Sequence, residues 1–152
     1  MADRISWTFY GYRTLAGRPD VQEWFDGLRE EEQDEVRDRL GYLQKLTPGA
    51  WGKPAFEPLG DEISEIRVKV NIPHLKAVYR IYGAFWPEGC RYSYTLLLGK
   101  SKKVDNDRRG KREAIERLKL LRRGEATIHE FKFETGADRE IASEQRGSPT
   151  IH

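Results

Sequence analysis

The chain has 152 residues, of which 38% are hydrophobic and 34% charged, and its formal net charge is +2. This length is typical of a single domain that buries its own core. No stretch approaches the roughly 18 consecutive apolar residues of a membrane-spanning helix, and the single cysteine, Cys90, excludes an intrachain disulfide and a cysteine-based zinc site. The first residues lack the apolar segment of a secretion signal, so we expect a protein of the reducing cytoplasm.

The two charge signs are concentrated in different parts of the chain. Residues 20–39 include nine acidic and three basic side chains, whereas residues 99–123 include eleven basic and four acidic ones. A strongly basic segment in a nearly neutral protein suits a polyanionic partner. The alternative is a solvated helix face on which opposite charges pair along the helix.

The amino-terminal third predicts a strand followed by two helices. Residues 5–10 alternate apolar and polar side chains, which indicates a strand. Pro19 suits the first turn of a helix, and from Val21 to Leu28 apolar residues recur at the spacing of one helical face. A second helix is predicted over residues 30–46, because its acidic first turn complements the helix dipole and a Thr-Pro-Gly stop follows it. Two consecutive helices form a helical hairpin.

The middle of the chain changes to the period of β-strands. We expect strands over residues 64–70, 75–86 and 91–98, joined by tight turns into an antiparallel meander. A basic helix is predicted over residues 107–123, and Gly124 is its natural carboxyl-terminal stop.

The last part of the chain predicts a short strand and a tail. The strand is expected over residues 128–133, and residues 134–152 are polar and aperiodic, which favours a flexible tail after a domain of residues 1–133. The element order β-α-α-β-β-β-α predicts an α+β fold with a mainly antiparallel sheet. We expect the helical hairpin to cover one face of this sheet and leave the other partly open.

Alternation along the meander predicts which side chains share a face. On its first strand, Arg67 and Lys69 point away from the apolar core side, and Lys76 and Arg80 share a face of the second strand. If both faces are on one side of the sheet, cations crowd there, and a phosphodiester backbone is a reason for such crowding. The alternative is that Arg67 pairs with Glu65 or a neighbouring carboxylate as an ordinary cross-strand ion pair.

Three segments resemble motifs of the RelE/HigB toxin superfamily. Residues 59–67 (LGDEISEIR) resemble its L-x-x-G-hydrophobic-x-E-L-R element, and residues 78–82 (VYRIY) resemble its Y-R-hydrophobic-x-Y strand. Residues 96–103 (LLLGKSKK) resemble its L-L-x-G-F-x-K-K strand end, which precedes a helix with Glu-Ala in it. Their order and spacing match over roughly residues 5–123, and the phage-derived HigB-like branch is the most similar.

The resemblance implies a RelE-like fold and a metal-independent mRNA endonuclease in which the RNA 2′-hydroxyl attacks the adjacent phosphate. By position, Arg67 and Lys69 match the family's strand cations, with Lys69 a candidate base if cationic neighbours lower its pKa, and Arg80 matches its phosphate-stabilising arginine. Many members have a tyrosine in or after the last helix, but this chain has none after Tyr94. Some members use a histidine there, which His129 matches, and the alternative is an ordinary surface or strand histidine. The residues we expect to contact RNA are Lys76, Lys100, Lys102, Lys103, Arg108 and Arg109.

The implied partners are mRNA, the ribosome and a cognate antitoxin, expected to be of the helix-turn-helix type, without a metal, cofactor or membrane. The chain would then be the toxin of a type II toxin–antitoxin pair. Two alternatives remain open. One is a protein of the same fold without nuclease activity, either a ParE-like gyrase inhibitor or a phage-derived nucleic-acid-binding remnant. The other is an interaction module whose acidic helical hairpin binds a basic partner.

Overall fold

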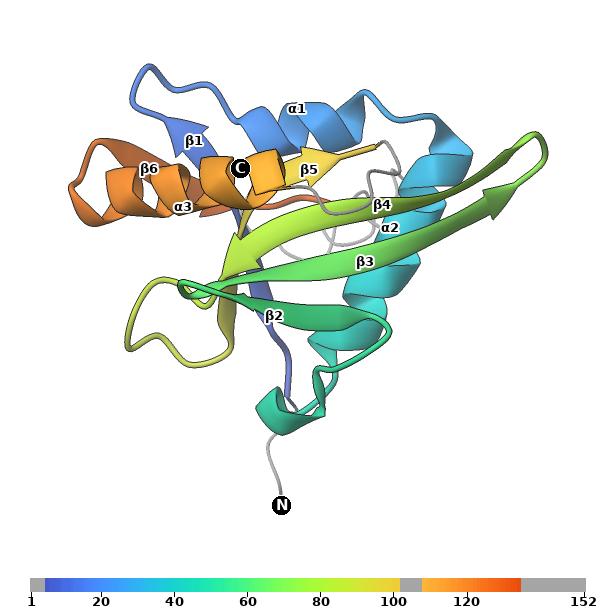
Figure 1. Cartoon of the computed structure of the whole chain (residues 1–152), viewed down its shortest axis with the longest axis horizontal. Helices are drawn as coiled ribbons and strands as arrows, with labels where there is room; N and C mark the ends of the chain where they lie inside the picture. Colours follow the sequence, from blue (N-terminus) through green and yellow to red (C-terminus); the bar gives the residue numbers. More distant parts are fainter. Residues whose placement is uncertain (1–4, 102–107, 135–152) are drawn as a thin grey trace, which may run out of the picture.

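A computed structural model describes residues 5–101 and 108–134 of the chain (Figure 1). The elements in these ranges are β1 (Thr8–Thr14), α1 (Asp20–Asp26), α2 (Glu30–Gln44), the short 3-10 helix η1 (Pro48–Ala50), β2 (Phe56–Gly60), β3 (Ile63–Ile72), β4 (Leu75–Ala84), β5 (Ser93–Lys100), α3 (Arg108–Arg122) and β6 (Ala126–Glu130). Lys102, Lys103 and nearly all of the predicted tail lie outside the described residues.

The described strands form one six-stranded sheet in the order β2-β3-β4-β5-β1-β6. Neighbouring strands are antiparallel except β1 and β5, which are parallel. The predicted α+β class is therefore confirmed, and the sheet is mixed and open. None of the helices in the described ranges is long and apolar enough to cross a membrane.

Helices lie on both faces of the sheet. Figure 1 shows α2 behind β3 and β4, and α3 in front of the sheet. On α2, Val36, Leu40 and Leu43 are fully buried, because they form the apolar stripe of an otherwise acidic helix. On the opposite side, α3 buries Ala114 and Leu118 together with Leu121 and leaves most of its basic residues at the surface.

Most predicted elements are present, with shifted ends. The strand predicted over residues 5–10 begins at Thr8, since Trp7 donates its backbone N–H to Gln44 at the end of α2 and its indole N–H to Leu46 just beyond it. The last strand, predicted over residues 128–133, spans Ala126–Glu130 instead. Over this range it pairs with β1, from Tyr10 opposite Glu130 to Thr14 opposite Ala126. The sequence reading missed β2 altogether.

A buried pair connects the sheet to the helical layer. The Tyr79 hydroxyl on β4 donates to the Glu32 carboxylate on α2, and both residues are buried. Burial, followed by the bond to Glu32, raises the pKa of Tyr79 to about 12. The bond from Tyr79 is the largest cause that lowers the pKa of Glu32, and the Arg29 backbone N–H donates to the same carboxylate at 2.7 Å.

We expect Tyr79→Phe to destabilise the fold by about 1.5–3 kcal/mol at neutral pH, as for loss of a hydrogen bond to a charged group. Because the folded-state pKa of Glu32 is lowered, the stabilisation is present above its ordinary value of 4.5 and is lost as the pH falls through the folded-state value. Because the folded-state pKa of Tyr79 is raised, its share is present below pH 10.0 and is lost as the pH rises toward about 12. Urea unfolding of both proteins across the pH range measures the loss of stability at low pH and the loss at high pH.

The matched control is Tyr42→Phe, since Tyr42 is 54% exposed and lies on the same helix as Glu32. Its stability should differ from wild type by less than about 0.5 kcal/mol at every pH. If the free energies of unfolding of wild type and Tyr79→Phe differ by the same amount from pH 7 to pH 3, the predicted dependence on protonation of Glu32 is contradicted.

Candidate functional site

The candidate site lies on the face of the sheet that α3 partly covers. Arg67 on β3 is directly opposite Arg80 on β4, and Arg80 is directly opposite Lys100 on β5. Directly paired residues on neighbouring strands point to the same face. The hairpin register thus brings these three predicted cations into one row.

This row is not a cluster of unpaired cations, because a carboxylate lies beside it. Glu65 is two residues before Arg67 on the same face and is only 1% exposed. It accepts a hydrogen bond from Arg67 Nε at 2.7 Å, and Arg80 Nη1 lies 3.1 Å from both of its oxygens. Arg67 and Arg80 lie side by side and share this carboxylate. The cross-strand ion pair that the sequence left as an alternative is present.

A second carboxylate reaches Arg67 from the edge strand. Glu57 on β2 is directly opposite Glu65, and its carboxylate accepts a hydrogen bond from Arg67 Nη2. Two like charges side by side destabilise a sheet unless a cation lies between them, and Arg67 supplies that cation. Lys53 Nζ also lies 3.1 Å from Glu57.

The charges in this cluster shift the pKa values of Glu57 and of Arg67 itself, each toward its charged form. The pKa of Glu57 is lowered, most strongly by the hydrogen bond from Lys53 and also by the charge of Arg67. Burial alone would lower the pKa of Arg67, but the hydrogen bonds and charges of Glu65 and Glu57 outweigh it and raise that pKa. Glu57 and Arg67 are therefore ionised at neutral pH.

An open pocket of about 320 Å³ lies over this ion-pair cluster. Glu65, Arg67 and Arg80 line it from the sheet, and Arg108 and Lys111 line it from the first turn of α3. Lys111 is paired with Asp61 at 3.2 Å. The pocket thus combines a buried carboxylate with cations from three elements, an arrangement that can bind an anion and accept a proton next to it.

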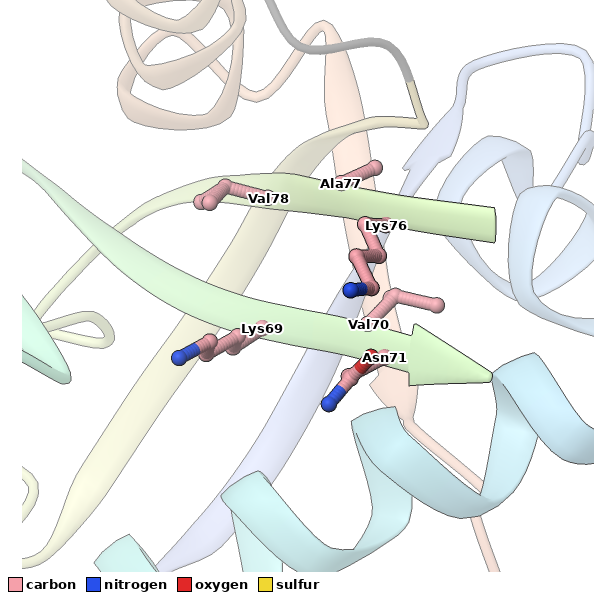
Figure 2. Close-up of a pocket in the computed structure, with 6 residues that line it drawn as sticks. All are labelled: Lys69, Val70, Asn71, Lys76, Ala77 and Val78. Carbon is pink, nitrogen blue, oxygen red and sulfur yellow. The ribbon is translucent and has the colours of Figure 1, made fainter. Parts of the chain in front are cut away.

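Lys69 and Lys76 lie further along the β3–β4 hairpin. They line a separate hollow of about 300 Å³, together with Asn71 and neighbouring apolar residues. Figure 2 shows Lys69 on β3 and Lys76 on β4 at this hollow. Both lysines are exposed. Lys69 therefore lies two residues beyond Arg67 on β3, closer to the turn between β3 and β4. It is not among the residues that line the Arg67–Arg80 pocket.

The remaining predicted RNA contacts that the structure describes are near α3 and the end of β5. Lys100 is partly exposed at the end of β5, and Arg108 and Arg109 are exposed in the first turn of α3. Only Arg108 of these three lines the pocket.

The structure does not bring His129 to the pocket. His129 is on β6 and pairs with Gly11 of β1, so β5 and β1 separate it from Arg80 by three strand spacings, or about 14 Å. His129 and Phe131 are two residues apart and point to the same side of the sheet. Phe131 packs on Phe25 of α1, so this side faces away from α3. Its Nδ1 lies 2.9 Å from the carbonyl oxygen of Glu130.

Two acidic residues of the site, Glu65 and Glu57, were not among the predicted site residues, although the sequence named Glu65 as an alternative ion-pair partner of Arg67. Glu65 had a signal, because it lies two residues before Arg67 and must share its face in a strand. Glu57 had none, since β2 was not predicted. No protein-family model, curated protein or solved structure matches the chain.

Proposed function

We propose that the chain is the toxin of a type II toxin–antitoxin pair, an mRNA endonuclease of the RelE/HigB type that acts on the ribosome in the cytoplasm. The observation that carries the proposal is the pocket in which Arg67 and Arg80 hold the buried carboxylate of Glu65. These residues are the E-x-R and Y-R positions of the motifs that resemble the family. The pocket is open to solvent and has further cations from α3 at its rim.

The pocket supplies two of the functions that RNA transesterification needs. The 2′-oxygen forms a bond to the adjacent phosphorus while the bond from phosphorus to the 5′-oxygen breaks, which leaves a 2′,3′-cyclic phosphate and a 5′-hydroxyl end. Arg67 and Arg80 would stabilise the charge on the pentavalent phosphate, as preorganised cations do. Glu65 would take the proton of the 2′-hydroxyl. Solvent water, which reaches the open pocket, would supply the proton that the 5′-oxygen gains as it leaves.

The arrangement of elements supports a RelE-like fold. A strand, a helical hairpin, a meander and a basic helix follow each other in the order expected from the resemblance, and the helical hairpin and the basic helix are on opposite faces of the sheet (Figure 1). The basic pocket gives an acidic antitoxin segment a target, since opposite potentials steer such an association. Lys69, Lys76 and Lys100 would then contact RNA beyond the scissile phosphate.

The position of His129 favours a second candidate, a protein of the same fold without nuclease activity. Because His129 is about three strand spacings from Arg80, it does not act as the second proton-transfer group of the pocket. A gyrase inhibitor of the ParE type or a nucleic-acid-binding remnant needs the basic face but no second proton-transfer group.

Induced expression in a bacterial host, with primer extension on abundant mRNAs, tests the proposal. We expect growth arrest and discrete cuts inside translated frames. Arrest without cuts would contradict the nuclease and support a gyrase-type target. Absence of arrest with a folded protein would support the binding remnant.

A further inference from the structure

The carboxylate of Glu57 occupies part of the pocket that we assign to the phosphate. Glu57 lines the same pocket as Arg80 and Arg108 and is bound to the Nη2 edge of Arg67. A guanidinium group binds a carboxylate and a phosphate through the same fork of N–H groups. Glu57 and a phosphodiester therefore compete for the same edge of Arg67.

The two carboxylates on Arg67 are not held equally. Glu65 is 1% exposed and is bound by two arginines from two central strands. Glu57 is 24% exposed and lies on the edge strand β2, and its ion-pair partners among the described residues are Arg67 and Lys53. If Glu57 releases Arg67, it keeps the charge of Lys53 beside it, so its displacement leaves no buried, unpaired charge.

Arg80 also has a hydrogen-bond donor that is not used. Its Nη1 contacts Glu65, but its Nε is buried and has no hydrogen-bond partner among the described residues. An unmet donor of a charged group is costly. An anion that enters between Arg67 and Arg80 would bring additional acceptor oxygens to the two guanidinium groups.

We infer that Glu57 is an internal mimic of the substrate phosphate, which a phosphodiester must displace from Arg67 before it binds. This inference rests on the proposed function, because it gives the Arg67–Arg80 pocket a phosphodiester ligand. Glu57 then sets the affinity of the pocket for anions and lowers it in the free protein. Removal of its charge opens the Nη2 edge of Arg67 to the ligand.

The test is the binding of dimethyl phosphate, a phosphodiester monoanion, to the full chain, followed by the NMR signals of the arginine side chains. We expect Glu57→Gln to bind it about fivefold more tightly than wild type, the ratio that corresponds to an ion pair of this exposure. The control Glu31→Gln removes the same charge from an exposed position on α2 and should leave the affinity unchanged.

The double variant Glu57→Gln with Arg67→Gln should lose the gain, and Arg67→Lys replaces Arg67→Gln if that variant does not fold. Unchanged or weaker binding by Glu57→Gln, or a gain that persists without Arg67, would overturn the inference. RNA cleavage by the same proteins is measured separately. If tighter binding through Arg67 accompanies a complete absence of cleavage, the nuclease proposal fails and the phosphate site stands.

Discussion

Arg80→Met is expected to lower the rate of RNA cleavage by about 10²–10³-fold, the effect of removing one preorganised donor from a developing phosphate charge. The same substitution leaves Glu65, which is 1% exposed, with Arg67 as its remaining arginine partner. Removing one partner of a buried ion pair costs about 3–5 kcal/mol when the remaining charge is left unpaired, and the cost is lower here because Arg67 stays bound to Glu65. Thermal unfolding of the variant therefore has to be measured beside its activity.

A second variant separates catalysis from folding. Arg80→Lys keeps the charge beside Glu65 but loses the planar guanidinium group, whose Nη1 lies 3.1 Å from both of its oxygens. We expect it to stay folded and still to lose about 10²-fold in cleavage rate. The control is Arg91→Met, which removes the same charge from an exposed position between β4 and β5 and should leave cleavage unchanged. Wild-type cleavage by Arg80→Lys would exclude Arg80 from the phosphate site.

Gly83→Ala is expected to destabilise the fold by about 3 kcal/mol or more, because there is no space for the new methyl group. A Cβ at this position on β4 would lie 2.5 Å from the Thr95 carbonyl oxygen and 2.5 Å from the ring of Tyr94. The carbonyl belongs to the backbone of β5, and the ring is fully buried with its hydroxyl 2.8 Å from that of Ser64. Neither the Thr95 carbonyl group nor the Tyr94 ring can move aside without a large loss of stability, because the interior is close-packed.

The matched substitution is Gly41→Ala in the middle of α2, where a Cβ would meet nothing within 4 Å. Alanine is the better helix former by about 1 kcal/mol, so this variant should be more stable than wild type. Chemical denaturation of both variants measures the two opposite shifts. Equal stability of Gly83→Ala and wild type would show that β4 and β5 are not packed as described.

The period of the apolar residues explains why so much of the fold was predictable. Ile66, Val68 and Val70 alternate along β3, and all three are buried as that alternation requires. Gly124 has a positive φ of 73° after α3, as a glycine stop should. These features depend on neighbours along the chain, which the sequence states directly.

The missed strand depends on a partner instead. The segment Phe56–Gly60 is short and contains Pro58 and Gly60, which argue against a strand. It becomes an edge strand because β3 offers it a ladder, and an edge tolerates proline.

The site divides in the same way. The opposition of Arg67 and Arg80 follows from a hairpin whose turn the sequence shows, whereas the contact of Glu57 with Arg67 needs the register of the unpredicted β2. The distance of His129 from the pocket depends on the parallel pairing of β1 with β5, because β6 follows β1 to the far edge. Such non-local pairing has no signature in local spacing.

The most direct test of the central claim is the chemistry of the RNA ends formed after the chain is induced in a bacterial host. We expect new 5′-hydroxyl ends, each matched by a 2′,3′-cyclic phosphate, with wild type and with Arg91→Met but not with Arg80→Lys. If these ends are absent while growth stops, or if Arg80→Lys produces them at the wild-type level, the Glu65–Arg67–Arg80 pocket is not the site of an RNA endonuclease.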